Sequence, residues 1–335
     1  MVTMADGASR AWRVHELGPP HQALRLEARP VRPPGEGEVR VRVEAVGLNF
    51  ADLLVCAGRY QERPEPPFSP GFEAAGVVVQ VGGGSTLRPG QRVIVVPEPP
   101  EGAMQESLTV GEEQVYPVPE SVPVATAAVL HVAYATAHAA LHRRAALRPG
   151  ETLLITGGAG GVGSAAVQLG KAAGARVLAT ATGSARAEAC RRLGADLVVD
   201  LAVDDDVVEQ VRAATGGRGA DVVVDVVGGD LFGRLRRCLA FEGRLVAVGF
   251  AGGSVPAVPV NHVLLRGYSV LGLYLSAYRR QDPALLRQIH DHLLSLLEEG
   301  RIDPAIHAEL PFEQAPAGLQ MVARREVIGR VVLRC

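Results

Sequence analysis

Hydrophobic and polar residues alternate strictly in one part of the N-terminal third of the chain. Within residues 38–48, Val39, Val41 and Val43 alternate with charged residues, and Ala45 continues the apolar series. This period of two predicts a strand with one buried and one solvated face. Two more strands and a proline-rich loop are predicted nearby, at 74–81, 92–96 and 96–102. The chain up to about residue 125 is therefore predicted to be mostly β.

The pattern changes after Pro123. Residues 124–147 are rich in alanine and read as helical, and strands then alternate with helices. The strands are predicted at 152–156, 176–181, 196–201, 221–227, 243–249 and 268–275, and the helices at 161–174, 184–193, 206–215 and 229–240. Residues 221–227 are nearly continuous valine, as expected of a parallel strand that is covered on both faces. This region predicts an α/β fold with a parallel sheet.

The C-terminal part begins with an amphipathic helix at 283–300. One side of this helix carries its apolar residues, namely Leu285, Leu286, Ile289, Leu293, Leu296 and Leu297. The last 35 residues then read as strand, helix and strand. We expect them to return to the first domain, because they are too short to bury a core of their own.

Composition and charge narrow the class of protein. The 335 residues are enough for two domains, and the net charge of −2 gives no reason to expect a nucleic-acid partner. No apolar run is expected to be long enough to cross a membrane, and Met1 to Arg10 lacks the apolar core of a secretion signal. The cysteines lie far apart, without C-x-x-C spacing, and predict free thiols: Cys56, Cys190, Cys238 and Cys335. We therefore expect a cytoplasmic protein.

The stretch 153–164 carries the clearest chemical signal. A short apolar run ends at a glycine cluster in which Gly158, Gly160 and Gly163 fit G-x-G-x-x-G, and a helical pattern follows. Strand, glycine turn and helix together predict a dinucleotide site with its pyrophosphate at the helix N-terminus. The predicted contacts are Gly158, Ala159, Gly160, Gly161, Val162 and Gly163. A purely structural turn is the alternative, whereas a P-loop is excluded because no Lys-Ser or Lys-Thr follows.

The end of the second predicted strand bears on the choice between NADPH and NADH. An NAD site usually has an acidic residue about 20 residues after the first glycine. Residues 179–184 contain no acid, while Thr182, Ser184 and Arg186 offer hydroxyls and a guanidinium to a 2′-phosphate. We predict NADPH as the cofactor. Alternatively, Ser184 is only a helix N-cap and Arg186 only a solvated charge.

Several segments together resemble one family. They are Gly47–Leu54, Gly58–Tyr60, Pro66–Val78, Tyr134–Ala137, the glycine turn and Ile328–Leu333. In these segments the chain resembles the zinc-independent medium-chain reductases, and most of all the NADPH:quinone oxidoreductases of the zeta-crystallin type. The resemblance covers nearly the whole chain.

The resemblance implies a particular architecture. It implies a GroES-like, mostly-β catalytic domain formed by residues 1–127 and 274–335. It implies a Rossmann domain, with a doubly wound parallel sheet, at 128–273. It also implies a cleft between the domains and a homodimer built on Rossmann edge strands.

The resemblance further implies catalysis without zinc. Metal-dependent relatives have cysteine at the position of Asn49, histidine at that of Phe72 before Glu73, and cysteine near Val132. The residues present here do not suit zinc in the usual way. His131 lies beside the third position, but the other two positions carry no zinc ligand of the usual kind.

Two other histidine pairs need a separate explanation. His138 and His142 are one helical turn apart, which suits a metal, but no third ligand is evident and packing is the simpler explanation. His290 and His292 are expected on different helix faces and suggest no site.

The same resemblance implies the site residues. Asn49 and Tyr60 match active-site positions, with the Asn49 amide as a donor to substrate or ribose and the Tyr60 hydroxyl orienting a carbonyl or passing a proton. The alternatives are that Asn49 only stabilises a turn and that Tyr60 only closes an apolar cleft. Cofactor contacts are implied at Thr136, Gly249, Phe250 and Arg325, with Arg330 as a second arginine candidate.

These residues predict NADPH-dependent reduction of quinones by hydride transfer without a metal. A quinone is already electrophilic, and an aromatic oxyanion spreads the added charge, so neutral hydrogen-bond donors suffice. The alternative is NADPH-dependent reduction of activated double bonds in enones or enoyl thioesters. An alternative of another class is a nucleotide-binding structural protein, of the crystallin kind.

Overall fold

The structure is a computed structural model that describes residues 8–204 and 206–335. It contains two compact units, one formed by the chain up to Val132 with Ile306–Cys335 and the other by Ala133–Ala305. The predicted domain ranges remain predictions; they differ from these units mainly at residues 274–305, which pack in the second unit. Residues 1–7, which carry most of the N-terminal segment used to expect a cytoplasmic protein, lie outside the described residues.

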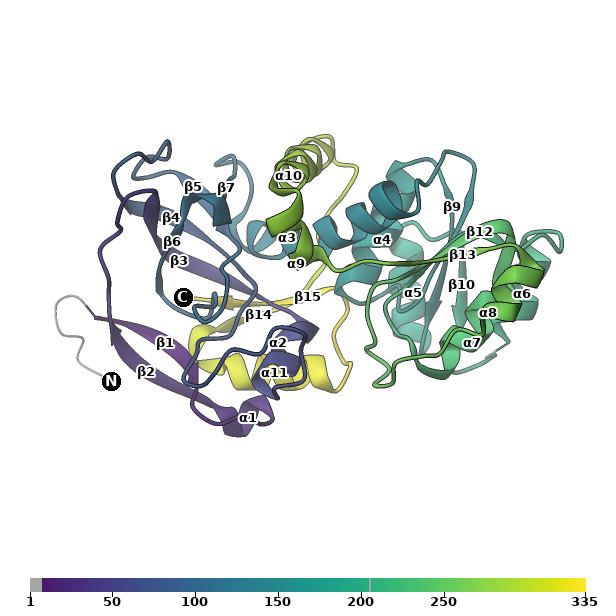
Figure 1. The fold of residues 1–335 in the computed structure, drawn as a ribbon, viewed down its shortest axis with the longest axis horizontal. Coiled ribbons are helices and arrows are strands. Elements are labelled where there is room, and N and C mark those ends of the chain that lie inside the picture. The colour runs from purple at the N-terminus through teal and green to yellow at the C-terminus, as the bar shows by residue number, and fades with distance from the viewer. Residues whose placement is uncertain (1–7, 205) are drawn as a thin grey trace. The chain divides into compact units, whose positions relative to one another are not determined.

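The first unit contains a two-stranded and a seven-stranded sheet (Figure 1). The larger sheet has the order β14-β15-β3-β4-β5-β7, with β6 paired to β3. Its strands are β3 (Glu38–Leu48), β4 (Glu73–Val81), β5 (Arg92–Val95), β6 (Ser107–Gly111), β7 (Val115–Pro117), β14 (Ile306–Pro311) and β15 (Arg330–Arg334). The smaller sheet pairs β1 (Ala8–Val14) with β2 (Leu24–Pro30), and short helices α1 (Pro20–Ala23), α2 (Phe50–Cys56) and α11 (Ala315–Ala323) belong to this unit. The predicted mostly-β N-terminal region is confirmed.

Strand β3 shows how the sequence pattern positions the site. Val39, Val41, Val43 and Ala45 are at most 3 % exposed, so the predicted alternation is confirmed. The register pairs Gly47 with Glu73 on β4 and Leu48 with Val331 on β15. Asn49, the next residue, therefore lies where three strands and the start of α2 meet.

The second unit contains a six-stranded parallel sheet of order β10-β9-β8-β11-β12-β13. Its strands are β8 (Thr152–Ile155), β9 (Arg176–Ala181), β10 (Leu197–Asp200), β11 (Ala220–Asp225), β12 (Leu239–Ala247) and β13 (Ser269–Gly272). The connecting helices are α4 (Gly161–Ala172), α5 (Ser184–Arg192), α6 (Val207–Ala214), α7 (Gly229–Cys238) and α8 (Val260–Arg266). This is the predicted doubly wound sheet, and its switch point lies between β8 and β11.

Some predicted boundaries are wrong by a few residues. Helix α7 was expected to reach residue 240 but ends at Cys238, and β12 starts at once at Leu239, not at residue 243. Leu239 already pairs with Ala220 on β11, so the backbone is extended at this residue and the helix ends before it. The sequence patterns also gave no sign of the short elements β1, β2, α2, β6, β7, α8 and α9 (Leu275–Gln281), which are too brief for a clear period.

The alanine-rich segment forms helix α3 (Val124–His138) and continues as a π-helix at Ala139–Arg144. At 21 residues, this helix is long and apolar enough to meet the length and composition of a membrane span. The expectation that no apolar run reaches that length is therefore wrong. The reason is that a helix buried on most sides is apolar nearly all round, and 72 % of this window is buried in the fold.

The predicted amphipathic helix and the strand, helix and strand after it are confirmed. Helix α10 (Pro283–Glu298) buries Leu286, Ile289, Leu293 and Leu296. After it, β14, α11 and β15 return to the first unit, where β15 pairs with β3.

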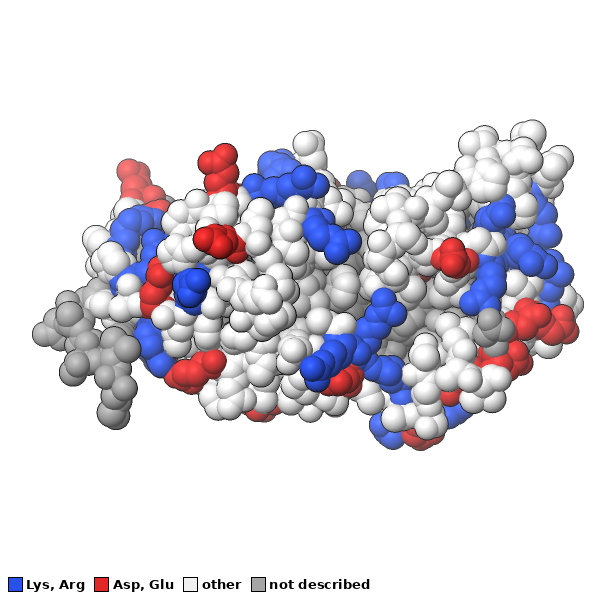
Figure 2. Space-filling view, turned by 90° about the horizontal axis from the view of Figure 1, so that it is seen from below, with Lys and Arg blue, Asp and Glu red and all other residues white. Residues whose placement is uncertain are grey.

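The surface carries charges of both signs between wide uncharged areas, as Figure 2 shows for one face.

Candidate functional site

The glycine turn joins β8 to α4, and its three motif glycines have different tasks. A Cβ atom on Gly163 would lie 2.1 Å from the carbonyl oxygen of Gly157, and one on Gly158 would lie 2.8 Å from the Cβ of Ala179. These two glycines allow close packing of helix and strands. A Cβ atom on Gly160 would meet only the Gly157 oxygen, at 3.4 Å, so this position faces open space. The tight turn itself falls on Gly157, whose φ is +59°.

The start of helix α4 provides the phosphate donors. The helix has 12 residues with Gly160 at its N-cap, and the N–H of Ser164 is the first to bond back, to Gly160 at 2.7 Å. The N–H groups of Gly161, Val162 and Gly163 therefore have no carbonyl within the helix to bond. Together with the helix dipole, they form an anion site that suits a pyrophosphate.

Three buried polar side chains that the sequence analysis did not single out surround the turn. Thr156, Thr180 and Asp225 are at most 1 % exposed. The N–H of Gly157 donates to Thr180 Oγ1 at 3.2 Å, and the Thr156 hydroxyl donates to Asp225 Oδ1 at 2.7 Å. The sequence does contain a signal for these three residues, because each is a polar residue at the end of an otherwise apolar strand.

The predicted 2′-phosphate residues lie together at the end of β9 and the start of α5. Arg186 Nη1 donates to the carbonyl oxygen of Thr182 at 3.2 Å. The N-cap is Gly183, with φ +92°, and Ser184 is the first residue of the helix. The helix has no side-chain capping bond. The alternative that Ser184 is the N-cap is therefore wrong. The next strand adds an acid that counting along the chain missed, since Asp200 Oδ1 accepts from the N–H of Gly183 at 2.8 Å.

The residues expected near the nicotinamide follow strand β12. The N–H groups of Val248 and Gly249 donate to the carbonyl oxygen of Asp225, at 2.8 and 3.4 Å. Phe250 is 37 % exposed. Thr136 is half-buried on helix α3, in the same compact unit. Arg325 belongs to the first unit, between α11 and β15, and is exposed.

In the first unit, the Asn49 side chain points its amide into the protein. Its Nδ2 donates to the carbonyl oxygen of Gly47 at 3.1 Å and to Glu73 Oε1 at 3.3 Å. Its backbone N–H donates to Asp52 Oδ2 at 2.7 Å. Both amide hydrogens thus have acceptors within the protein, which supports the alternative that Asn49 stabilises local structure.

A buried ion pair supports this arrangement. Arg330 Nη2 donates to Glu73 Oε1 at 2.6 Å, and Glu73 Oε2 accepts from the N–H of Val132 at 2.8 Å. Glu73 is fully buried and Arg330 is 5 % exposed. Arg330 is therefore occupied as the partner of Glu73, and its candidate role as a phosphate ligand does not fit. Burial raises the pKa of the neighbouring Asp52 carboxyl group to about 7, although the hydrogen bonds that this group accepts lower the same pKa.

The positions that bind zinc in metal-dependent relatives do come together. Asn49 and the backbone of Val132 both contact Glu73, the residue after Phe72. An amide, a phenyl ring, an ion-paired carboxylate and a valine are not a zinc donor set. Over residues 8–204 and 206–335, no group of three His, Cys, Asp or Glu side chains could hold a metal ion.

The other histidines pack in a way the sequence did not indicate. Helix α10 brings His292 to His138, with their Nδ1 and Nε2 atoms 2.9 Å apart, and the rings of His138 and His142 are 4.5 Å apart. His292 therefore has a neighbour that its spacing did not suggest, although the three rings do not form a metal group. Burial, together with the adjacent imidazoles, lowers the pKa of His138 to about 3, so the His138 ring is neutral at pH 7.

Tyr60 and Cys56 complete the predicted catalytic region. The Tyr60 ring meets the Phe72 ring edge-on, with centroids 5.2 Å apart, and packs partly buried against the core. Cys56 is fully buried, and burial raises the pKa of its thiol, as expected of a packing residue and not of a nucleophile.

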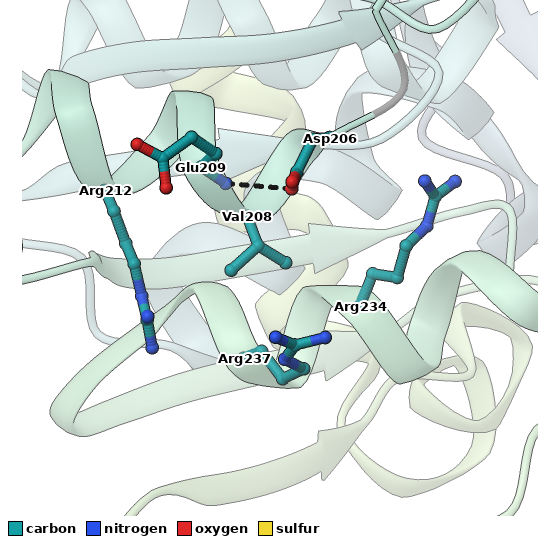
Figure 3. Close-up of a pocket in the computed structure, with 6 residues that line it drawn as sticks. All are labelled: Asp206, Val208, Glu209, Arg212, Arg234 and Arg237. Carbon is teal, nitrogen blue, oxygen red and sulfur yellow. Dashed lines mark hydrogen bonds between the residues drawn. The ribbon is translucent and has the colours of Figure 1, made fainter.

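A cavity of about 300 Å³ opens between helices α6 and α7 (Figure 3). Arg212, Arg234 and Arg237 line it together with Asp206 and Glu209, so its charges are mixed. Asp206 caps helix α6 by accepting from the N–H of Glu209 at 3.0 Å. None of the predicted site residues lines this cavity.

Comparison with known proteins connects the two units to one family. Family models match for the alcohol dehydrogenase GroES-like domain at residues 35–120 and for zinc-binding dehydrogenase at residues 161–291. Quinone oxidoreductase-like protein 2 of Bos taurus is 38 % identical over 336 residues, which cover 99 % of this chain and 95 % of that protein.

Solved structures agree with this match. Mycobacterial Rv1454c complexed with NADPH has a TM-score of 0.90 at 31 % identity, over 98 % of this chain and all of that one. Escherichia coli quinone oxidoreductase complexed with NADPH gives 0.89 at 27 %, over 97 % and 100 %. The CurK enoyl reductase gives 0.88 at 27 %, over 98 % and 99 %. The chain belongs to the medium-chain dehydrogenase/reductase family, among the quinone oxidoreductase-like proteins.

Proposed function

We propose that this protein reduces quinones by transferring hydride from NADPH without a metal ion. The observation that carries this proposal is the glycine turn, where a Cβ on Gly160 would contact only the Gly157 oxygen and the first N–H groups of helix α4 have no acceptor within the helix. The relatives named quinone oxidoreductase-like protein 2 and quinone oxidoreductase support it, as do the neighbours solved with NADPH.

The residues present fit NADPH along its length. The N–H groups of Gly161–Gly163 would hold the pyrophosphate, and Thr182, Ser184 and Arg186 would hold the 2′-phosphate. Thr136, Gly249 and Phe250 would border the nicotinamide, and we keep Arg325 as a further phosphate contact. When bound, NADPH supplies the hydride.

The protein's own groups then have a limited task. Charge added to a quinone spreads over an aromatic oxyanion, so one or two neutral donors are sufficient to stabilise it. We assign that task to the Tyr60 hydroxyl. Asn49 receives a positioning role, because its amide hydrogens bond Gly47 and Glu73.

The direct test follows NADPH oxidation at 340 nm with 1,4-benzoquinone and 9,10-phenanthrenequinone as acceptors. We expect turnover that persists in EDTA, and we expect Tyr60→Phe to lower kcat about tenfold or more while NADPH affinity stays unchanged. Loss of activity on chelation would contradict the metal-free scheme. Unchanged kcat in the Tyr60 variant would remove Tyr60 from the site.

Reduction of enones or enoyl thioesters is the second candidate, favoured by the similarity to the CurK enoyl reductase. Both reactions use the same hydride and need an apolar acceptor slot. A panel of quinones, enones and enoyl thioesters with NADPH separates them by their kcat/KM values. NADPH binding without turnover of any acceptor would instead favour a structural, crystallin-like role.

We also propose a homodimer that forms along strand β13. This strand is the edge of the six-stranded sheet, and Phe241, Leu264 and Leu265 nearby are 78 to 80 % exposed. Exposed apolar residues beside a strand edge favour pairing with a second copy. Light scattering should give twice the chain mass, and Leu264→Glu should yield monomers.

We also propose a cytoplasmic location, which cell fractionation tests.

A further inference from the structure

Asp225 is a buried carboxylate that bonds only neutral donors among the described residues. It is 1 % exposed, at the end of β11. Its Oδ1 accepts from the Thr156 hydroxyl at 2.7 Å, from the N–H of Val227 at 2.9 Å and from the N–H of Gly228 at 3.1 Å. A buried charge without a cation is costly unless several donors converge on it, and here they do.

These bonds tie the glycine turn to the turn after β11. Thr156 immediately precedes Gly157, and its Oγ1 also accepts from the N–H of Val226 at 3.0 Å. Methyl groups of Val226 and Val227 lie 3.4 Å from where a Cβ of Gly157 would be. The positions of the two turns are therefore coupled at the switch point of the sheet.

The turn after β11 in turn supports the loop after β12. The N–H of Ala251 donates to the carbonyl oxygen of Val226 at 3.1 Å, and that of Gly252 donates to Val227 at 2.7 Å. A Cβ on Gly228 would lie 2.8 Å from the Phe250 ring. The loop that carries Gly249 and Phe250 thus rests on the turn that Asp225 organises.

The sheet itself does not depend on these side chains. Backbone pairing joins β8 and β11 from Val222 with Leu153 to Val224 with Ile155. Thr156 follows the last residue of β8 and Asp225 is the last residue of β11, so both lie just beyond the paired residues of that ladder.

We propose that Asp225, acting through Thr156 and residues 226–228, is a positioning residue that sets the spacing between the glycine turn and the loop 249–252. This inference rests on the proposed function, in which the glycine turn holds the pyrophosphate of NADPH and the loop 249–252 borders the nicotinamide. The hydrogen bonds that the Asp225 carboxylate accepts come from Thr156, Val227 and Gly228, so it acts through these residues. It acts on binding of the whole dinucleotide more than on binding of either half.

The test compares variants of the full chain by two dissociation constants. One is the Kd for NADPH, which is read from nucleotide fluorescence. The other is the Kd for 2′,5′-ADP, which lacks the nicotinamide half. Thr156→Val removes the bridging hydroxyl at nearly constant volume, and Thr156→Ser restores it. Thr152→Val is the matched control, because Thr152 is 3 % exposed at the opposite end of the same strand. Asp225→Ala removes the carboxylate.

We expect Thr156→Val and Asp225→Ala to raise the Kd for NADPH about tenfold or more, and the Kd for 2′,5′-ADP much less. Thr156→Ser and Thr152→Val should bind both ligands like the original chain. Equal weakening of both ligands, or an equal effect of Thr152→Val, would overturn the proposal and indicate general destabilisation.

The proposed function fails separately. If the original chain binds NADPH but reduces no quinone, the function is wrong while the Kd comparison still decides the role of Asp225. If it binds no dinucleotide, both proposals are overturned.

Discussion

The two compact units each bury a polar network, and the networks differ in charge. In the first unit, Asp52 and Glu73 lie near the buried cation Arg330, which ion-pairs with Glu73. In the second unit, Asp225 bonds a hydroxyl and backbone N–H groups. The network of the first unit pairs opposite charges, whereas in the network of the second unit a carboxylate orients loops through neutral donors.

This difference predicts what each network controls. Removing one member of a buried ion pair leaves an uncompensated charge, and the cost appears in folding stability. Removing a bond that orients a loop beside a ligand site appears mainly in ligand affinity. Substitutions in the ion pair of the first unit should therefore change the free energy of unfolding, and those of Asp225 and Thr156 should change NADPH binding.

The largest expected effect is that of Arg330→Met. It leaves the Glu73 carboxylate buried without its cation, which costs about 3–5 kcal/mol of unfolding free energy. Urea unfolding measures this loss. The double variant Glu73→Gln with Arg330→Met should recover part of it, because no unpaired charge remains. A single variant as stable as the original chain would refute the contrast between the units.

Two glycines sharpen the comparison within the second unit. Gly163→Ala places a Cβ 2.1 Å from the Gly157 oxygen, so it should lower stability by about 1–3 kcal/mol. Gly160→Ala has room, and φ −80° suits alanine, so its stability should stay the same while NADPH affinity falls about tenfold. Melting temperature and Kd separate the two outcomes. A strongly destabilised Gly160 variant would contradict this division.

A change of intermediate size is expected at the 2′-phosphate end. Arg186→Glu should weaken NADPH about tenfold or more and NADH only slightly, because only NADPH carries the extra phosphate. Asp200 lies beside this end and holds Gly183, so Asp200→Asn serves as a control for local charge. Equal losses for both nucleotides would remove Arg186 from the site.

A pH dependence is also expected in the first unit. Burial raises the pKa of Asp52 to about 7 in the folded protein, against about 4 in an unfolded chain. The folded state therefore binds this proton more tightly, and stability falls as pH rises from about 4 to about 7. Asp52→Asn should flatten that part of the profile in urea titrations at several pH values. An unchanged slope would show that Asp52 does not titrate there.

The sequence alone determined the features that depend on local pattern. Alternation specified β3, near-continuous valine specified β11, and the glycine spacing specified the turn before α4, because each follows from backbone geometry over a few residues. The resemblance added the candidate residues outside the glycine turn and the 2′-phosphate region, namely Asn49, Tyr60, Thr136, Gly249, Phe250 and Arg325.

Only the tertiary structure decided which groups pair across long distances in the chain. It joined Arg330 to Glu73, Thr156 to Asp225 and His292 to His138, pairs that lie 257, 69 and 154 residues apart. It also turned the Asn49 amide inward and brought Asp200 to Gly183. Such pairs depend on strand order and helix packing, which no local period encodes, since a buried polar group takes whatever partner the fold brings within hydrogen-bond distance.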